Sequence, residues 1–202
     1  MRKLKSIILL LIAFTSQLVA QNTVHLCVGT NHNFGVPYTI GSSYNWQVQA
    51  NTTSATITSG NGTEHIIMDL NNSGVFQLLL EETDVNGCTG YDSILVEIHA
   101  LPNPNIFAVG PISFCEGDSV LLQVDSNYVT QSWNNGTTTI YTYADTSVNY
   151  YVNVTDTNGC SNNSNAINVV VHPNPIADFS INGICANIPS QFMNTSIVST
   201  GS

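Results

Sequence analysis

The residues best suited to bind a metal ion lie near the start of the chain, where His25, Cys27 and His32 are close together. Imidazole nitrogen and thiolate sulfur are ligands that Zn²⁺ takes in structural sites. A cysteine in an exported protein is more often half of a disulfide, however, and Cys88 offers a partner later in the chain. We therefore predict no metal site and assign Cys27 to a disulfide.

Two pairs of acidic residues could supply a general acid and a general base, namely Glu81 with Glu82 and Glu116 with Asp118. Adjacent residues of a strand point to opposite faces of a sheet, so Glu81 and Glu82 are poorly placed to act together. Glu116 and Asp118 fall in a Cys-x-Gly turn. The sequence also lacks Gly-x-Ser-x-Gly, His-Glu-x-x-His and Ser-x-x-Lys motifs. We expect no catalytic residue, no cofactor and no enzymatic activity.

The charge distribution excludes nucleic acid as a partner. All three basic residues lie within the first five positions, whereas all 13 acidic residues follow position 60. Nucleic-acid binding uses Lys and Arg to displace counterions from phosphates, and the rest of the chain has neither.

The first residues predict export. Basic residues precede an apolar run at 7–14, and small residues lead up to Ala20. This order is typical of a secretory signal peptide, which we place at residues 1–20. The apolar run is too short to cross a bilayer, and no later stretch reaches ~20 apolar residues. We expect a secreted or outer-surface protein with no transmembrane span.

One phrase occurs almost twice, as TDVNGCTG at 83–90 and as TDTNGCSN at 155–162. Asn-Gly is a strong hairpin signal, because both central residues of such turns favour positive φ. The aspartates could also begin a calcium loop, but neither copy supplies the remaining oxygen ligands. We expect the aspartates to accept backbone N–H bonds instead. The predicted turn residues are Asp84, Asn86, Gly87, Asp156, Asn158 and Gly159.

Apolar residues alternate with polar ones on both sides of each phrase, at 75–84 and 93–104 and again at 147–156 and 166–175. Period-two alternation predicts half-buried strands, so each phrase is the tip of a hairpin. Both downstream segments end in Pro-Asn-Pro, which predicts a stiff linker. His99 and His172 hold equivalent places before these linkers, which indicates a packing role rather than a catalytic one.

Four tyrosines lie close together upstream of the second phrase, at Tyr141, Tyr143, Tyr150 and Tyr151. Alternation puts Tyr141 and Tyr143 on one face of a strand and directs Tyr150 into the core. We therefore predict Tyr141, Tyr143 and Tyr151 as possible ligand-facing residues, able to form an aromatic platform for a sugar.

Each phrase lies near the end of a longer repeated segment, called a module below. Each module has a cysteine near its start, then a tryptophan, then the cysteine of the phrase. These residues are Cys27, Trp46 and Cys88, followed by Cys115, Trp133 and Cys160. The order resembles that of immunoglobulin-like sandwiches, in which a core Trp packs beside the disulfide. We expect both tryptophans in cores and each disulfide as an edge staple, because the cysteines lie near strand ends.

Four cysteines allow three connectivities. The economical choice pairs Cys27 with Cys88 and Cys115 with Cys160, so that each bridge closes one module. Cys185 is then left for a partner in further sequence.

The first copy also resembles a known class of repeat. Its Cys-x-Gly, its Trp, its Ser-Gly-Asn-Gly-Thr at 59–63 and its Glu-Thr-Asp-x-Asn-Gly-Cys at 82–88 are similar to PKD-like repeats. Such repeats occur in large surface proteins that gliding Gram-negative bacteria export by the type IX system. The second copy resembles the Ig-like repeats that accompany them. The last segment resembles the opening of a PKD domain at Ala177, Phe179, Cys185, Phe192, Asn194 and Ser196.

The predicted fold class is all-β, with tandem immunoglobulin-like or PKD-like β-sandwich modules. After the signal peptide we expect a PKD-like sandwich at 21–101, an Ig-like sandwich at 102–172 and the start of a truncated third PKD-like module at 173–202.

The resemblance implies a structural and adhesive surface protein. Its partners are then an extracellular polysaccharide or surface ligand, and export machinery that recognises a C-terminal region missing from this sequence. The alternative is a carbohydrate-binding accessory region of a larger secreted hydrolase. A calcium-dependent surface layer is a third possibility, and a rise in thermal stability with calcium would distinguish it.

Overall fold

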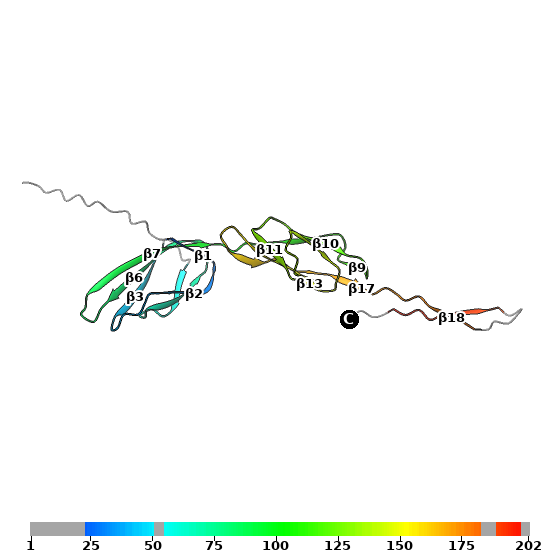
Figure 1. The fold of residues 1–202 in the computed structure, drawn as a ribbon, viewed down its shortest axis with the longest axis horizontal. Coiled ribbons are helices and arrows are strands. Elements are labelled where there is room, and N and C mark those ends of the chain that lie inside the picture. The colour runs from blue at the N-terminus through cyan, green and yellow to red at the C-terminus, as the bar shows by residue number, and fades with distance from the viewer. Residues whose placement is uncertain (1–22, 51–54, 183–188, 199–202) are drawn as a thin grey trace, which may run out of the picture.

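The computed structural model describes residues 23–50, 55–182 and 189–198, and within these ranges it consists of β-strands and loops. Figure 1 shows two β-sandwich modules, one after the other, followed by a separate hairpin. The predicted all-β class with tandem immunoglobulin-like sandwiches is confirmed. None of the described residues forms a helix that could span a membrane. The predicted signal peptide at 1–20 lies outside the described residues.

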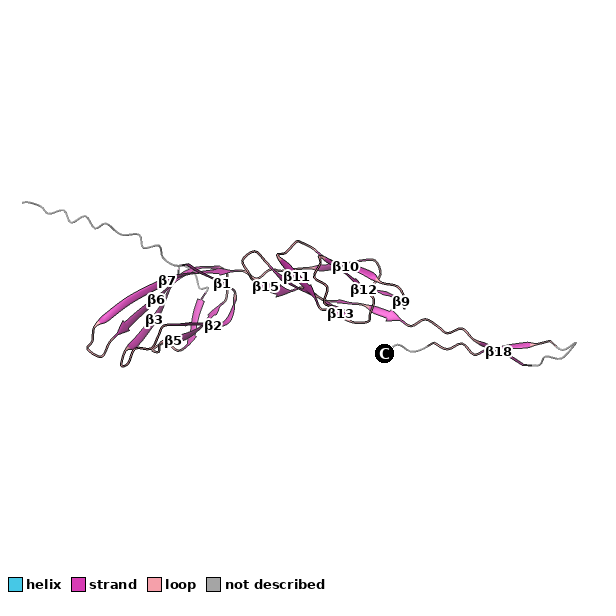
Figure 2. Ribbon diagram, viewed as in Figure 1, coloured by secondary structure: helices cyan, strands magenta, loops and turns pink. Residues whose placement is uncertain are grey.

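The first module is a sandwich of a four-stranded and a three-stranded sheet (Figure 2). The larger sheet has the order β1-β7-β6-β3 and the smaller has the order β2-β5-β4. β1 is parallel to β7, and the other pairs are antiparallel. The strands are β1 (Thr23–Cys27), β2 (Gly29–Gly35), β3 (Ser43–Ala50), β4 (Ala55–Ser59), β5 (His65–Leu70), β6 (Gly74–Thr83) and β7 (Thr89–His99).

The core of the first module follows from the alternation of its strands. Phe76, Leu78 and Leu80 of β6 are buried on one face, together with Val96 and Ile98 of β7. Removing such apolar side chains from water is the main favourable term in folding. The strands next to the repeated phrase therefore form the centre of this sandwich.

The second module has shorter strands and its own core. Its sheets have the orders β12-β10-β8 and β11-β14-β15, with the two-stranded pairs β13-β16 and β17-β9 beside them. The parallel pair of β9 with β17 corresponds to that of β1 with β7. The strands are β8 (Ile106–Val109), β9 (Ser113–Cys115), β10 (Val120–Val124), β11 (Thr130–Trp133), β12 (Tyr141–Ala144), β13 (Asn149–Tyr150), β14 (Val152–Thr155), β15 (Ser161–Asn163), β16 (Ile167–Asn168) and β17 (Val170–His172).

The apolar face predicted for 147–156 is largely present. Tyr150, Val152 and Val154 are buried in the second core. Val148, predicted on the same face, is 44% exposed, because it lies before β13 begins.

Both tryptophans are buried, Trp46 in the first core and Trp133 in the second. Trp46 donates its indole Nε1–H to the carbonyl of Thr63, and Trp133 donates its own to the carbonyl of Thr139, both at 2.8 Å. Asn61, from the Ser-Gly-Asn-Gly-Thr stretch, accepts the Trp46 backbone N–H at 3.0 Å and donates to its carbonyl at 3.3 Å. The polar edge of each buried ring is therefore satisfied.

The last described segment is a hairpin of β18 (Phe179–Asn182) and β19 (Gln191–Asn194), extended by a bridge between Ile176 and Ile197. The rings of Phe179 and Phe192 lie 5.5 Å apart across it. Cys185 lies outside the described residues. The domain limits at 21–101, 102–172 and 173–202 stay predictions, although each of the two cores falls within one of the first two ranges.

Candidate functional site at the module junction

A disulfide joins the two modules. Cys27, the last residue of β1, is bonded to Cys160, which lies in the turn between β14 and β15. Their Cα atoms are 5.6 Å apart, although the two residues are 133 positions apart in the sequence. Cys160 is fully buried. The bridge therefore ties the first strand of one sandwich to a hairpin of the next.

The pairing predicted within each module is wrong. Cys88, the predicted partner of Cys27, and Cys115, the predicted partner of Cys160, are both free and exposed. Cys115 lies opposite His172 in the parallel pair of β9 with β17.

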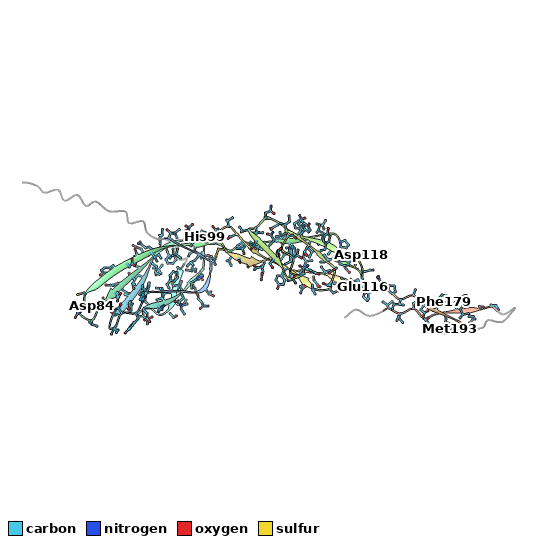
Figure 3. The ribbon with its side chains drawn as sticks, in the orientation of Figure 1. Asp84, His99, Glu116, Asp118, Phe179 and Met193 are labelled. Carbon is cyan, nitrogen blue, oxygen red and sulfur yellow. A yellow bond between two sulfur atoms is a disulfide. The ribbon has the colours of Figure 1, made fainter. Side chains whose placement is uncertain are left out.

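The register of β7 explains why Cys27 cannot reach Cys88. Cys27 lies opposite His99, the last residue of β7, whereas Cys88 directly precedes the first residue of this 11-residue strand. At about 3.3 Å per residue such a strand is about 35 Å long. Figure 3 shows the turn of Asp84 at the end of the module far from His99. The two cysteines therefore lie at opposite ends of the first sandwich.

The first copy of the repeated phrase is a tight turn built on Asp84. Its Oδ1 accepts the backbone N–H groups of Asn86 and Cys88, both at 2.8 Å, and its own N–H donates to the carbonyl of Cys88 at 2.9 Å. Gly87 has a φ of 82°, which a residue with a Cβ rarely adopts. These N–H donors, above all that of Cys88, hold the pKa of the Asp84 carboxyl below its ordinary value.

The second copy repeats this geometry. Asp156 Oδ1 accepts the backbone N–H groups of Asn158 and Cys160 at 2.9 Å, and Gly159 has a φ of 81°. The aspartate thus fixes the backbone of the cysteine that bonds to Cys27. In this copy the turn positions a bridge between modules.

The linker between the modules is anchored to the second one. Asn162 donates its side-chain amide to the carbonyl of Pro102 at 2.9 Å. Asn165 accepts the Ile106 N–H at 2.8 Å and donates to the Ile106 carbonyl at 3.2 Å. Pro104 is buried. The Pro-Asn-Pro segment is therefore held close to the hairpin that carries Cys160.

A cluster of three potential metal ligands lies beside the disulfide on the outer face of β1 and β7. His25 lies opposite Glu97, and Cys27 lies opposite His99. His25 Nδ1 is 3.1 Å from His99 Nε2 and 3.4 Å from Glu97 Oε2. The two imidazole rings stack with centroids 5.3 Å apart. One donor atom from each residue lies within 4.8 Å of the others.

This cluster differs from the grouping that the sequence offered. His32 is on β2, in the other sheet, and the Cys27 sulfur is in the disulfide. The sequence points to His25 and His99 only separately and does not single out Glu97, since only the parallel register of β1 with β7 brings the three residues together. The signal in the sequence was that Glu97 and His99 are two positions apart, which puts both side chains on one face of a strand.

Two of the three predicted ligand-facing tyrosines come together. Tyr141 and Tyr143 are exposed on β12, with their rings 6.3 Å apart and nearly perpendicular. Across β10, Phe107 and Val109 of β8 are exposed in the same two register rows. Tyr151 is also exposed, but it lies between β13 and β14, outside this sheet. The outer face of β12-β10-β8 is thus an aromatic and apolar surface.

Of the two acidic pairs, Glu81 and Glu82 lie on β6, and Glu116 and Asp118 lie between β9 and β10. Glu81 accepts hydrogen bonds from the Asn45 side-chain amide at 3.1 Å and from the Tyr91 hydroxyl at 3.2 Å. Its hydrogen bond raises the pKa of Tyr91. Glu116 and Asp118 lie in a turn at the far end of the second module (Figure 3). Glu81 thus serves to connect neighbouring strands.

A cavity of about 160 Å³ opens between the two sheets of the first module, lined mainly by apolar side chains that include Phe34, Leu78 and Ile94. Ligand pockets usually measure about 300–1,000 Å³. This cavity is smaller than a typical small-molecule site.

Comparison with known proteins gives distant likenesses. No family model and no curated protein matches the chain. Among solved structures it is similar to the fibronectin(III)-like modules of Clostridium thermocellum CbhA, with 10% identity, a TM-score of 0.37, and coverage of 76% of this chain and 92% of that one. It is similar to amphioxus IgVJ-C2, with 13% identity, a TM-score of 0.29, and coverage of 73% and 99%.

A third similar structure is SGBP-B of the Bacteroides ovatus mixed-linkage glucan utilization locus, in complex with a mixed-linkage heptasaccharide. It has 14% identity and a TM-score of 0.31. The match covers 72% of this chain but only 42% of that protein. PKD membership and type IX export stay predictions.

Proposed function

We propose that this chain is a non-catalytic, extracellular stalk of a bacterial surface protein, in which a disulfide transmits load between modules. Export by the type IX system and an adhesive role for the whole protein belong to this proposal. The Cys27–Cys160 bridge between two separate cores is the observation that carries it. Disulfides persist in oxidising surroundings outside the cell, which agrees with the predicted signal peptide.

The bridge shortens the covalent path through the molecule. A force applied at the two chain ends enters β1, crosses from Cys27 to Cys160 and leaves through the last strands of the second module. The chain between these cysteines, including β2 to β14, lies outside that path. Unfolding this segment therefore adds no length while the disulfide is intact.

Two covalent connections, the linker and the disulfide, join the modules side by side. β7 leads into the linker at His99, and Cys27, which lies opposite His99, provides the second connection. The linker is itself held by Asn162 and Asn165. Two covalent connections at neighbouring strands restrict bending and twisting between the modules more than one linker does, which suits a spacer.

Single-molecule force spectroscopy tests the proposal directly. Residues 21–202 would be held at their ends and stretched, with the disulfide intact or reduced and alkylated. The fully unfolded chain should be longer after reduction by the contour length of the 133-residue separation, about 440–480 Å. A Cys27→Ser and Cys160→Ser double variant should extend like the reduced protein. Equal extension of oxidised and reduced protein would show that the disulfide transmits no force between the modules.

The runner-up is a carbohydrate-binding accessory region, and the exposed face formed by Tyr141, Tyr143 and Phe107 favours it. Aromatic rings present apolar faces on which sugars stack. Affinity electrophoresis against β-glucans should then show retardation that is lost in a Tyr141→Ala and Tyr143→Ala double variant. Tyr151→Ala is the matched control outside this sheet. Identical mobility with and without polysaccharide would remove this candidate.

A further inference from the structure

We propose that His25, Glu97 and His99 form a binding site for a divalent transition-metal ion of the zinc class. The site lies on the outer face of the β1–β7 pair, next to the inter-module disulfide. It goes beyond the stalk function, since neither load transfer nor sugar binding requires a metal.

The spacing of the donor atoms fits a tetrahedral ion. Bonds of about 2.0–2.1 Å at tetrahedral angles place any two ligand atoms about 3.3 Å apart. His25 Nδ1 is 3.1 Å from His99 Nε2 and 3.4 Å from Glu97 Oε2. Two of the three donor pairs thus already have this spacing, and the third pair, His99 with Glu97, lies within 4.8 Å and closes when the ion binds.

The scaffold holds the ligands in place before an ion arrives. All three side chains are on paired strands, and the backbone N–H of Val28 donates to the His99 carbonyl at 2.9 Å just beyond the pair. Cys27, two residues from His25 and opposite His99, is fixed by its bond to Cys160. Sites carried by rigid elements keep their geometry better than sites on loops.

The donor set selects the kind of ion. Two imidazoles with one carboxylate suit zinc and its neighbours, whereas calcium and magnesium take mainly oxygen ligands. Three protein ligands leave a fourth position for water or for a group from another molecule. Beyond residue 5 the chain has no Lys or Arg and has 13 acidic residues, so its field attracts cations.

The second module supplies a built-in control. In its parallel pair, Ser113 takes the place of His25, Val170 that of Glu97 and His172 that of His99. His172 Nε2 there lies 2.9 Å from the Ser113 hydroxyl. The same framework thus retains one of the three donors and should not bind the ion tightly.

Isothermal titration with Zn²⁺ tests the site. Residues 21–202 would be used with the disulfide intact and the free thiols alkylated, because Cys88 and Cys115 are themselves zinc ligands when deprotonated. We expect one Zn²⁺ per chain, and at least a tenfold weaker Kd in His25→Ala, His99→Ala and Glu97→Gln.

Two matched variants should keep the wild-type Kd. His172→Ala removes the equivalent histidine of the second module, and His65→Ala removes an exposed histidine 3.6 Å from Glu64 that belongs to no group of three potential ligands among the described residues. Co²⁺ substitution adds a structural readout, since a tetrahedral site gives intense visible bands that His25→Ala should abolish. Melting temperatures measured without metal check that each variant is folded.

The proposal is overturned if wild-type protein binds Zn²⁺ no more tightly than the His25→Ala and His99→Ala double variant. It is equally overturned if His65→Ala or His172→Ala weakens binding as much as His99→Ala does. Neither result depends on the force measurement, so the metal site and the stalk can fail separately.

Discussion

Cys27 and Cys160 lie in different sandwich modules, yet their Cα atoms are 5.6 Å apart and their sulfurs are bonded. The bond turns two consecutive modules into one covalent ring, closed by the linker on one side and the disulfide on the other. The second copy of the repeated hairpin thus connects two modules, whereas its sequence predicted a bridge within one.

Peptide mapping without reduction should find Cys27 linked to Cys160. Iodoacetamide added to the native protein should label Cys88 and Cys115, because both are exposed and free. A bridge from Cys27 to Cys88 would contradict the register of β1 with β7, and a bridge from Cys115 to Cys160 would contradict the bond between the modules.

Removing the bridge should destabilise both modules. In the chain-entropy model, closing a loop of 133 residues contributes about 5 kcal/mol, an upper value for the loss in a Cys27→Ser and Cys160→Ser double variant. Urea unfolding followed by circular dichroism measures it. A Cys88→Ser and Cys115→Ser double variant should unfold like the wild type, and an equal loss there would show that the effect is not due to the bridge.

Truncating Trp46 should weaken the first core selectively. Trp46→Ala leaves a large cavity and should cost about 3–5 kcal/mol in that module. Trp46→Phe keeps most of the ring but leaves the Thr63 carbonyl without its indole donor, which should cost about 1–3 kcal/mol. Hydrogen exchange followed by mass spectrometry resolves the modules. Equal loss of protection around Trp133 would mean that the two cores unfold as one unit.

Local features could be predicted from the sequence because they depend on neighbouring residues. The alternation at 75–84 predicts which β6 side chains are buried, and Asn-Gly after an aspartate predicts the turn. The burial of Tyr150 follows in the same way. Each is fixed by the two-residue period of a strand or by a side chain bonding its own turn.

Long-range features could not be predicted in this way. The spacing of Cys27, Cys88, Cys115 and Cys160 is compatible with bridges within modules and between them. The choice depends on β1 running parallel to β7, which puts Cys27 at the end of the module next to the linker. The same register brings His25 to Glu97 and His99. The disulfide between the modules and the cluster of potential metal ligands were therefore both missed because this register could not be predicted.

The turn of Asp84 should weaken in acid. Folding lowers the pKa of this carboxyl, chiefly through the Cys88 N–H, so the turn gains stability that is complete above the ordinary value of about 3.9. That gain is lost as the pH falls through the lowered pKa of the folded state. Amide protection of Asn86 and Cys88, corrected for intrinsic exchange, should therefore drop as the pH is lowered from about 5 to about 2. Asp84→Asn keeps an acceptor oxygen but cannot ionise, so its protection should be lower at pH 5 and independent of pH. A wild-type turn equally protected at both pH values would show that the ionised carboxylate is not what holds it.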